Sequence, residues 1–464
     1  MHRLDPDLAR SLADLLGPDR FRTDEPARQQ FGRDWTRFAP ANPSAVALPD
    51  TAAEVQAIVQ LAGEHGCPLV PSGGRTGLSG GAVAAQGELV VALDRMAAIL
   101  ECNPTGRRLV CEAGATTAAI QQAAQDHGLI YPVDFASSGS SQIGGNVATN
   151  AGGIQVIRYG MTRDWVTGLK VVSGSGELLD LNRGLVKNNT GLDLRHLMIG
   201  SEGVLGIIVE ATLALTEPPG DPRVLVLGVP SMQAVMAVLD LCRNPLDVLA
   251  FELFSEGSLD KVIAHKGLQA PLSEAQPWYV LMEFDAAKSD TELPYDLVEQ
   301  GMAAGWISDA VVSQSERQRR ALWRLREEIS ETLSQWTPYK NDISTTVDRV
   351  PALQENLERI VTRRYPEFEV IWYGHVGDGN LHLNVLKPDN LSIADFQSRC
   401  HEVSGEIFAA VADLGGSISA EHGVGLLKKP FLHHSRSGSE LALMRGIKAL
   451  LDPRGILNPG KVFD

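Results

Sequence analysis

Two short stretches near the carboxyl end contain side chains of the types that bind metal ions. GHVGDGNLHLN contains His375 and His382, and SAEHGVG contains Glu421 and His422. The spacing of seven would place the first two histidines on opposite faces of one continuous strand, but the intervening Gly-Asp-Gly-Asn interrupts it, so both imidazoles can converge. Two imidazoles and a carboxylate with one position left open are typical of a catalytic zinc site. The alternative is that these are separate loop histidines with polar partners.

A second group of residues is suited to binding a carboxylate. The stretch SERQRRALWRLREEISETLS (315–334) predicts one charged helix, on which Trp323, Arg326 and Ser330 share a face. Arginine can hold a carboxylate through two parallel hydrogen bonds, and Lys340, beyond a proline break, can reach the same group. For most arginines of this helix the plain interpretation is a solvated face beside glutamates.

Three glycine-rich stretches indicate a large polar cofactor. They are PSGGRTGLSGG (71–81), SSGSSQIGGNVATNAGG (137–153) and MIGSEGVLGIIVEATL (198–213). Glycine lets successive backbone N–H groups turn toward phosphate oxygens. None of the stretches matches an ATPase P-loop or a dinucleotide-binding G-x-G-x-x-G pattern. A pyrophosphate-bearing cofactor explains all three better than independent surface turns do.

The elements that must position these residues form two parts. Up to about residue 216, strands alternate with helices, which predicts a layered α/β part. Its first helix has Val55, Ile58, Val59 and Ala62 on one face, with Thr51 as the cap. The second glycine-rich stretch is predicted to be a loop.

A proline-rich break, EPPGDPR (217–223), separates this part from a second one. After it we expect an α+β domain with an antiparallel sheet and helices on one side. The last forty residues are expected to be largely helical. The predicted boundaries are 1–219 for the cofactor domain, 220–424 for the substrate and metal domain, and 425–464 for a C-terminal segment that returns to the first domain.

Composition restricts the class of protein. The 464 residues carry a formal net charge of −16, which disfavours nucleic acid and anionic membranes as partners. The five cysteines have no C-x-x-C spacing, which fits a reducing compartment. The acidic N-terminal stretch does not resemble a signal peptide, and no apolar run is long enough to span a membrane. We therefore expect a soluble, cytoplasmic protein.

Taken together, the motifs resemble a known family. The glycine-rich stretches and the terminal NPGK are similar to the FAD-binding domain of vanillyl-alcohol-oxidase (PCMH-type) flavoproteins. WRLREEIS, YKNDIS, GHVGDGNLH and SAEHGVG extend the resemblance to the branch that contains D-lactate and D-2-hydroxyglutarate dehydrogenases. The resemblance implies an α+β fold with a two-domain PCMH-type FAD-binding part, an antiparallel-sheet cap domain for the substrate, and a C-terminal helical segment.

The resemblance also implies roles for individual residues. It makes His375, His382 and Glu421 metal ligands and His422 the catalytic base, and His422 is a substrate contact as well. It gives the remaining substrate contacts as Arg326, Ser330, Lys340 and Asn384. It implies non-covalent FAD contacts at Arg75, Thr76, Gly77, Leu78, Ser79, Pro132, Asp134, Ser137, Gly144, Gly145, Asn146, Thr149, Asn150, Gly153, Gly203, Ile207 and Asn458.

The implied activity is FAD- and zinc-dependent oxidation of D-2-hydroxyglutarate to 2-oxoglutarate, with side activity on D-malate. One alternative is a dehydrogenase of D-lactate or another D-2-hydroxy acid, and manganese or cobalt are alternatives to zinc at the same ligands. Another is a non-catalytic flavin subunit of a redox complex, which the complete His/His/Glu/His set disfavours. By the same resemblance we expect an electron-transfer flavoprotein as electron acceptor and a homodimer.

Overall fold

The computed structural model describes residues 4–36, 38–288 and 290–463. These residues form two compact units, and both units are discontinuous in sequence. The cofactor unit comprises residues 1–152, 161–218 and 421–464, and the sheet unit comprises 153–160 and 219–420. Of the helices in the described ranges, none has the length and apolar character needed to cross a membrane. The five cysteines are unpaired.

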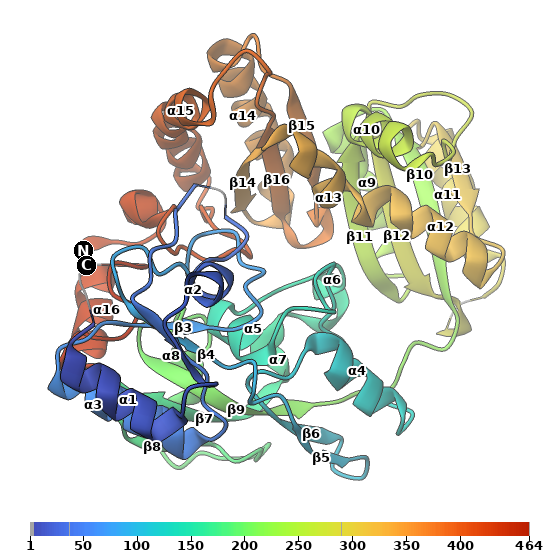
Figure 1. Cartoon of the computed structure of the whole chain (residues 1–464). Coiled ribbons are helices and arrows are strands. Elements are labelled where there is room, and N and C mark those ends of the chain that lie inside the picture. The colour runs from blue at the N-terminus through green and yellow to red at the C-terminus, as the bar shows by residue number, and fades with distance from the viewer. Residues whose placement is uncertain (1–3, 37, 289, 464) are drawn as a thin grey trace. The chain divides into compact units, whose positions relative to one another are not determined.

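The cofactor unit contains two sheets (Figure 1). The first has the order β1-β2-β4-β3 and is parallel except for β1. Its strands are β1 (Phe21–Arg22), β2 (Ala45–Ala47), β3 (Leu69–Ser72) and β4 (Leu89–Ala92). The second is antiparallel, with the order β5-β6-β9-β7-β8. Its strands are β5 (Ile99–Asn103), β6 (Arg108–Glu112), β7 (Val166–Ser173), β8 (Leu178–Leu181) and β9 (Gly206–Ala214).

Helices cover these sheets around a large hydrophobic core, and a smaller cluster packs against the β2–β4–β3 strands. They are α1 (Pro6–Leu16), α2 (Glu25–Phe31), α3 (Ala52–Glu64), α4 (Thr117–Gln125), α5 (Ile143–Thr149), α7 (Thr162–Trp165), α8 (Arg195–Met198) and α16 (Gly438–Leu451). In α3 the four residues predicted to face inward are all fully buried, and the Thr51 side chain caps the helix by accepting from the Glu54 N–H, which confirms that prediction. The C-terminal segment belongs to this unit, where Leu457 pairs with Leu69 of β3.

The sheet unit is built on one antiparallel sheet with the order β13-β10-β12-β11-β15-β16-β14. Its strands are β10 (Pro222–Val229), β11 (Val248–Ser255), β12 (Trp278–Asp285), β13 (Asp309–Val312), β14 (Tyr339–Ser344), β15 (Val370–Gly374) and β16 (Asn380–Val385). Its helices are α6 (Val156–Tyr159), α9 (Met232–Cys242), α10 (Glu256–Lys266), α11 (Leu293–Ala303), α12 (Glu316–Glu327), α13 (Ile329–Leu333), α14 (Val350–Arg364) and α15 (Ile393–Asp413).

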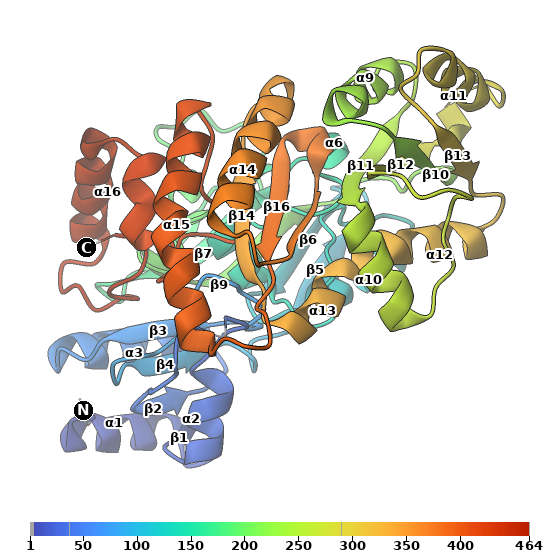
Figure 2. The ribbon, with the colours of Figure 1, turned by 90° about the horizontal axis from the view of Figure 1, so that it is seen from above.

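Helices pack on both faces of this sheet, so the prediction of helices on one side was wrong. Figure 2 shows α9 and α11 on one side and α10 and α12 on the other. The core on the α10, α12 and α13 side includes Val226, Phe254, Leu281 and Ile329. The predicted strands around 224–229, 248–254 and 278–284 are apolar at nearly every position, and such strands need cover on both faces.

Two local predictions also differ from the structure. The charged helix predicted over 315–334 is divided at Glu328 into α12 and α13, where Glu328 lies 3.4 Å from Lys266 of α10. The glycine-rich loop predicted over 137–153 contains a helix, α5. Gly144 lies in that helix, and its N–H donates at 2.8 Å to the carbonyl of Ala113, the residue that follows β6. At both positions the chain contacts a segment that is distant in the sequence.

Candidate active site

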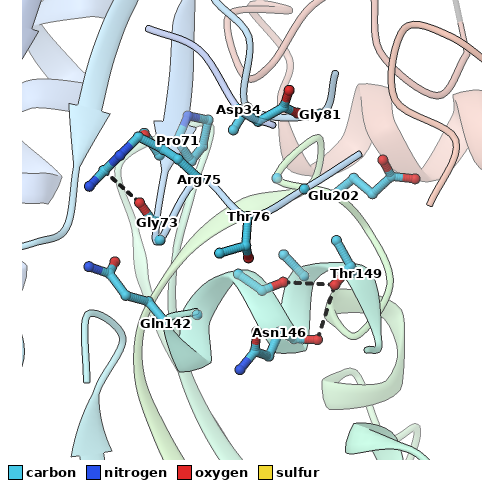
Figure 3. A pocket seen from close by; sticks show the side chains of 18 of the residues that line it. Asp34, Pro71, Gly73, Arg75, Thr76, Gly81, Gln142, Asn146, Thr149 and Glu202 are labelled. Atoms are coloured by element: carbon cyan, nitrogen blue, oxygen red, sulfur yellow. Dashed lines mark hydrogen bonds between the residues drawn. The ribbon is translucent and has the colours of Figure 1, made fainter. Parts of the chain in front are cut away.

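A cavity in the cofactor unit lies among the three glycine-rich stretches (Figure 3). Its empty space, including the part open to solvent, is about 900 Å³. Of the residues that the family resemblance implied, those lining it are Arg75, Thr76, Gly77, Ser79, Gly144, Gly145, Asn146, Thr149, Gly203, Ile207 and His422. Stretches far apart in the sequence therefore converge on one cavity.

The loop after β3 approaches its neighbours too closely for larger residues. A Cβ on Gly74 would lie 2.1 Å from the Ser140 carbonyl oxygen. Arg75 has a φ of 59°, and its guanidinium binds Asp94 at 2.6 Å and the Gly73 carbonyl at 2.6 Å. The Arg75 side chain therefore stabilises the loop conformation through protein contacts.

Helix α5 forms another wall of the cavity. A Cβ on Gly144 would lie 2.8 Å from the Ala113 Cβ, whereas one on Gly145 would meet no protein atom within 4 Å. The Thr149 hydroxyl donates to the Gly145 carbonyl at 3.0 Å (Figure 3). One glycine thus allows close packing inside the protein, and the next leaves open space at the cavity.

The other implied cofactor contacts do not line this cavity, and their roles stay predictions. Asn458 supports the loops, because its side-chain amide donates to the carbonyls of Gly81 (2.9 Å) and Glu202 (2.7 Å). Gly153 belongs to the sheet unit. The remaining ones are Leu78, Pro132, Asp134, Ser137 and Asn150.

The turn that carries His422 is held by groups of the cofactor unit. The Glu202 carboxylate accepts from the backbone N–H groups of Val424 (2.7 Å) and Gly425 (2.8 Å). The Ser79 hydroxyl donates to the Gly423 carbonyl at 3.0 Å. Burial raises the pKa of Glu202, and the two backbone donors oppose that rise. His422 lines the cavity from this supported turn.

In the sheet unit, polar side chains gather on one face of β11, β15, β16 and β14. Tyr373, His382 and Asp342 are aligned across three neighbouring strands, because Tyr373 pairs with His382 and His382 with Asp342. Asn384 and Lys340 form the next aligned pair. Directly paired residues project to the same face of a sheet, so this row lies on one side.

His375 and His382 converge, with ring centroids 5.2 Å apart in an edge-to-face arrangement. His375 Nδ1 lies 2.8 Å from Glu252 Oε1, and His382 Nδ1 lies 3.4 Å from Asp342 Oδ1. A carboxylate at Nδ1 leaves Nε2 as the coordinating atom, which is the usual arrangement of metal-binding histidines. Each of these two histidines can therefore supply one ligand to a metal ion.

The four implied substrate residues that belong to the sheet unit also come together. The Lys340 ammonium donates to the Ser330 hydroxyl at 2.9 Å. The Arg326 guanidinium lies over the Tyr373 ring at 4.9 Å, and burial raises the pKa of the Tyr373 hydroxyl. Among the described residues, Arg326 Nε and both polar atoms of the buried Asn384 amide have no hydrogen-bond partner. A polar ligand would satisfy them.

The chain is similar to known proteins. Two family models match: "FAD binding domain" over residues 43–182 and "FAD linked oxidases, C-terminal domain" over residues 219–462. The chain is 52% identical over 461 residues to D-2-hydroxyglutarate dehydrogenase of Stutzerimonas stutzeri, with 99% of both chains covered. It is 53% identical over 455 residues to the protein of that name from Xanthomonas citri pv. viticola, covering 98% of this chain and 96% of that one.

The chain belongs to the D-2-hydroxyglutarate dehydrogenase family of FAD-linked oxidoreductases. A solved structure of 4-ethylphenol oxidase from Gulosibacter chungangensis has a TM-score of 0.77 at 19% identity, covering 98% of this chain and 96% of that one, which is a likeness of fold. The predicted α+β, PCMH-type FAD-binding fold is confirmed. FAD, predicted as cofactor from the glycine-rich stretches and the resemblance, is confirmed as well.

Several buried polar residues of the two sites of this FAD-linked oxidoreductase were not predicted from the sequence. Asp34 and Glu202 line the cofactor cavity, and burial raises the pKa of Asp34 to about 6. Glu252 is a single charge within the apolar strand VLAFELF, a pattern that could have drawn attention to it. Asp342 lies two residues after Lys340 on β14 and so on the same strand face, and Tyr373 lies on β15 two residues before His375.

Proposed function

We propose that the protein oxidises D-2-hydroxyglutarate to 2-oxoglutarate with FAD and a zinc ion, with side activity on D-malate. The observation that carries this proposal is the pair of cations in the sheet unit, Arg326 and Lys340, grouped with Ser330 and Asn384. A second carboxylate is what distinguishes this substrate from D-lactate. The names of the relatives from S. stutzeri and X. citri support the same substrate.

The distal carboxylate of the substrate would bind Arg326 and Lys340. Arg326 is 5% exposed, so a carboxylate there would be shielded from water and its interaction with the guanidinium would be strong. The Ser330 hydroxyl, which accepts from Lys340, can turn its own hydrogen toward the same carboxylate. The Asn384 amide can both donate to and accept from the substrate.

His375, His382 and Glu421 would hold the metal. Glu421 follows Ala420 in the chain, and the Ala420 N–H points to the carbonyl of Asp342 at 3.4 Å, on the strand next to His382. This backbone contact supports Glu421 as the third ligand. When bound, zinc supplies Lewis acidity that lowers the pKa of an alcohol.

His422 would accept the proton of the substrate hydroxyl. It lies next to Glu421 in the chain and lines the cofactor cavity, so one turn would supply both a metal ligand and the base. The two hydrogen bonds from Val424 and Gly425 to Glu202 keep this turn in place. FAD, bound non-covalently in the cavity, supplies the hydride acceptor, its N5 atom.

Anaerobic mixing of the purified enzyme with single substrates tests this proposal. We expect D-2-hydroxyglutarate to bleach the visible absorbance of the flavin and to yield one 2-oxoglutarate per flavin, D-malate to react more slowly, and D-lactate to react least. Equal rates with D-lactate and D-2-hydroxyglutarate would contradict the diacid assignment. Acid precipitation should release FAD into the supernatant; colour retained in the pellet would contradict non-covalent binding.

The family resemblance supports two further proposals, an electron-transfer flavoprotein as acceptor and a homodimer. A cytoplasmic location is a proposal that the cysteine pattern supports. Reoxidation of the reduced enzyme by a purified electron-transfer flavoprotein, faster than by oxygen, is the expected result for the first. Light scattering at two protein concentrations tests the second.

A further inference from the structure

Glu252 on β11 is buried and contacts two residues of the proposed substrate and metal site. Its side chain is 1% exposed. One carboxylate oxygen, Oε1, lies 2.8 Å from His375 Nδ1, and the other, Oε2, lies 2.7 Å from a terminal nitrogen of Arg326. The proposed metal ligand and the proposed carboxylate-binding arginine therefore share one anionic partner.

The surroundings of Glu252 make this contact informative. Its neighbours two positions away on the same strand face, Ala250 and Phe254, belong to a hydrophobic core, as does Leu281, which it pairs with on β12. A carboxylate in such a place is costly unless its charge is compensated. Arg326 supplies the compensating charge.

Glu252 is not needed merely to attach helix α12 to the sheet, because a second ion pair between α12 and the sheet already does so. Arg319, two turns earlier on α12, binds Glu283 of β12 at 2.5 Å, and Glu283 also accepts from Trp323 Nε1 at 3.0 Å. Glu283 is 2% exposed and lies on the same sheet face as Glu252. Among the described residues, Glu283 contacts Arg319, Trp323 and Gln155 but neither of the two histidines nor a proposed substrate residue, which makes it a matched control.

We propose that Glu252 is a positioning residue that couples the metal ligand His375 to the substrate-binding Arg326; this inference rests on the proposed function. A carboxylate only accepts hydrogen bonds, so its contact fixes the hydrogen of His375 on Nδ1 and leaves Nε2 for the metal. The second oxygen holds the Arg326 guanidinium over the Tyr373 ring and leaves its Nε available to a ligand. Metal affinity and recognition of the distal carboxylate therefore depend on the same side chain.

The test compares Glu252→Gln with Glu283→Gln in the full-length holoenzyme. Each variant is dialysed against graded concentrations of a chelator, and retained zinc is measured by elemental analysis while flavin absorbance confirms that FAD stays bound. We expect Glu252→Gln to lose zinc at a 10- to 100-fold lower chelator concentration than wild type, the usual effect of removing a carboxylate partner of a ligating histidine. Glu283→Gln should stay within about twofold of wild type in zinc retention, since its carboxylate touches no ligand.

A second variant distinguishes positioning from a general loss of stability. Glu252→Asp keeps the charge but is one methylene shorter, so it can approach either His375 or Arg326 and not both; we expect zinc retention between wild type and Glu252→Gln. The ratio of kcat/KM for D-2-hydroxyglutarate to that for D-lactate should fall in both Glu252 variants and stay unchanged in Glu283→Gln.

The possible results separate the two proposals. If wild type binds zinc and both Glu252 variants retain it as wild type does, the coupling role is wrong although the proposed function stands. If Glu283→Gln loses zinc as readily as Glu252→Gln, the effect is a general consequence of loosening α12, and the inference is overturned. Wild-type enzyme that turns over without any zinc would instead overturn the proposed function.

Discussion

Gly145→Ala should stabilise the apoprotein and weaken FAD binding, two effects of opposite sign on one protein. Gly145 lies inside α5, where an added methyl group meets no protein atom within 4 Å. Replacing glycine by alanine in a helix adds about 0.5–1 kcal/mol to the free energy of unfolding. The same methyl group projects into the cavity that we assign to FAD. Overpacking a filled site costs about 1–3 kcal/mol, which corresponds to roughly 5- to 150-fold in Kd.

The measurements are urea unfolding of the apoprotein and titration of apoprotein with FAD, followed by quenching of flavin fluorescence. Gly144→Ala is the matched control, because a Cβ there would lie 2.8 Å from the Ala113 Cβ and 3.1 Å from its carbonyl oxygen. That variant should lower the free energy of unfolding. A Gly145→Ala protein that is more stable and binds FAD with unchanged Kd would refute the placement of FAD against α5.

Three further predictions concern charge and metal. Lys340→Met should lower kcat/KM for D-2-hydroxyglutarate roughly 10- to 100-fold, since a hydrogen bond to a charged group is worth about 1.5–3 kcal/mol. The same variant should change kcat/KM for D-lactate by less than about threefold. Equal losses with both substrates would mean that Lys340 supports the fold. Arg326→Ala is a poorer probe, because it leaves Glu252 buried without its cation at a cost of roughly 3–5 kcal/mol in stability. Burial raises the pKa of Asp34 to about 6. The protonated carboxyl group therefore stabilises the folded state fully below about pH 4, and this contribution is lost as the pH rises through 6. The free energy of unfolding of Asp34→Asn apoprotein, relative to that of wild type, should rise by up to about 3 kcal/mol between pH 4 and pH 6, and a difference that does not change with pH would contradict this. Chelation should abolish turnover while the flavin spectrum persists, because the two histidines belong to the sheet unit and the FAD cavity to the cofactor unit.

Some features of this protein followed from local sequence alone. The buried face of α3 and its Thr51 cap were predicted correctly, because helix periodicity and capping depend on residues within one or two turns. Strands such as β11 and β12 were evident from runs that are apolar at nearly every position. The residue motifs also sufficed to recognise the family, which two family models match.

Other local predictions failed where distant contacts decided the outcome. Helix α5 contains two adjacent glycines, which disfavour a helix in isolation, yet it forms because Gly144 packs on Ala113. The break between α12 and α13 has no proline or glycine near it, and Glu328 at the break contacts Lys266. The second face of the sheet formed by strands β10 to β16 also had to be shielded from water, and helices that are separate in the sequence cover it.

Sequence by itself therefore determined which residue types were available for chemistry: the histidines, the arginine, the lysine and the glycine-rich backbone. Only the tertiary structure decided which carboxylate each of them meets. Glu252 lies 123 residues from His375, and Glu202 lies 222 residues from Val424, so no periodicity or spacing could join them. A buried carboxylate must find its partners wherever the packed chain brings donors close, because an uncompensated charge in the interior is too costly, and that choice is made only when the sheets and helices are assembled.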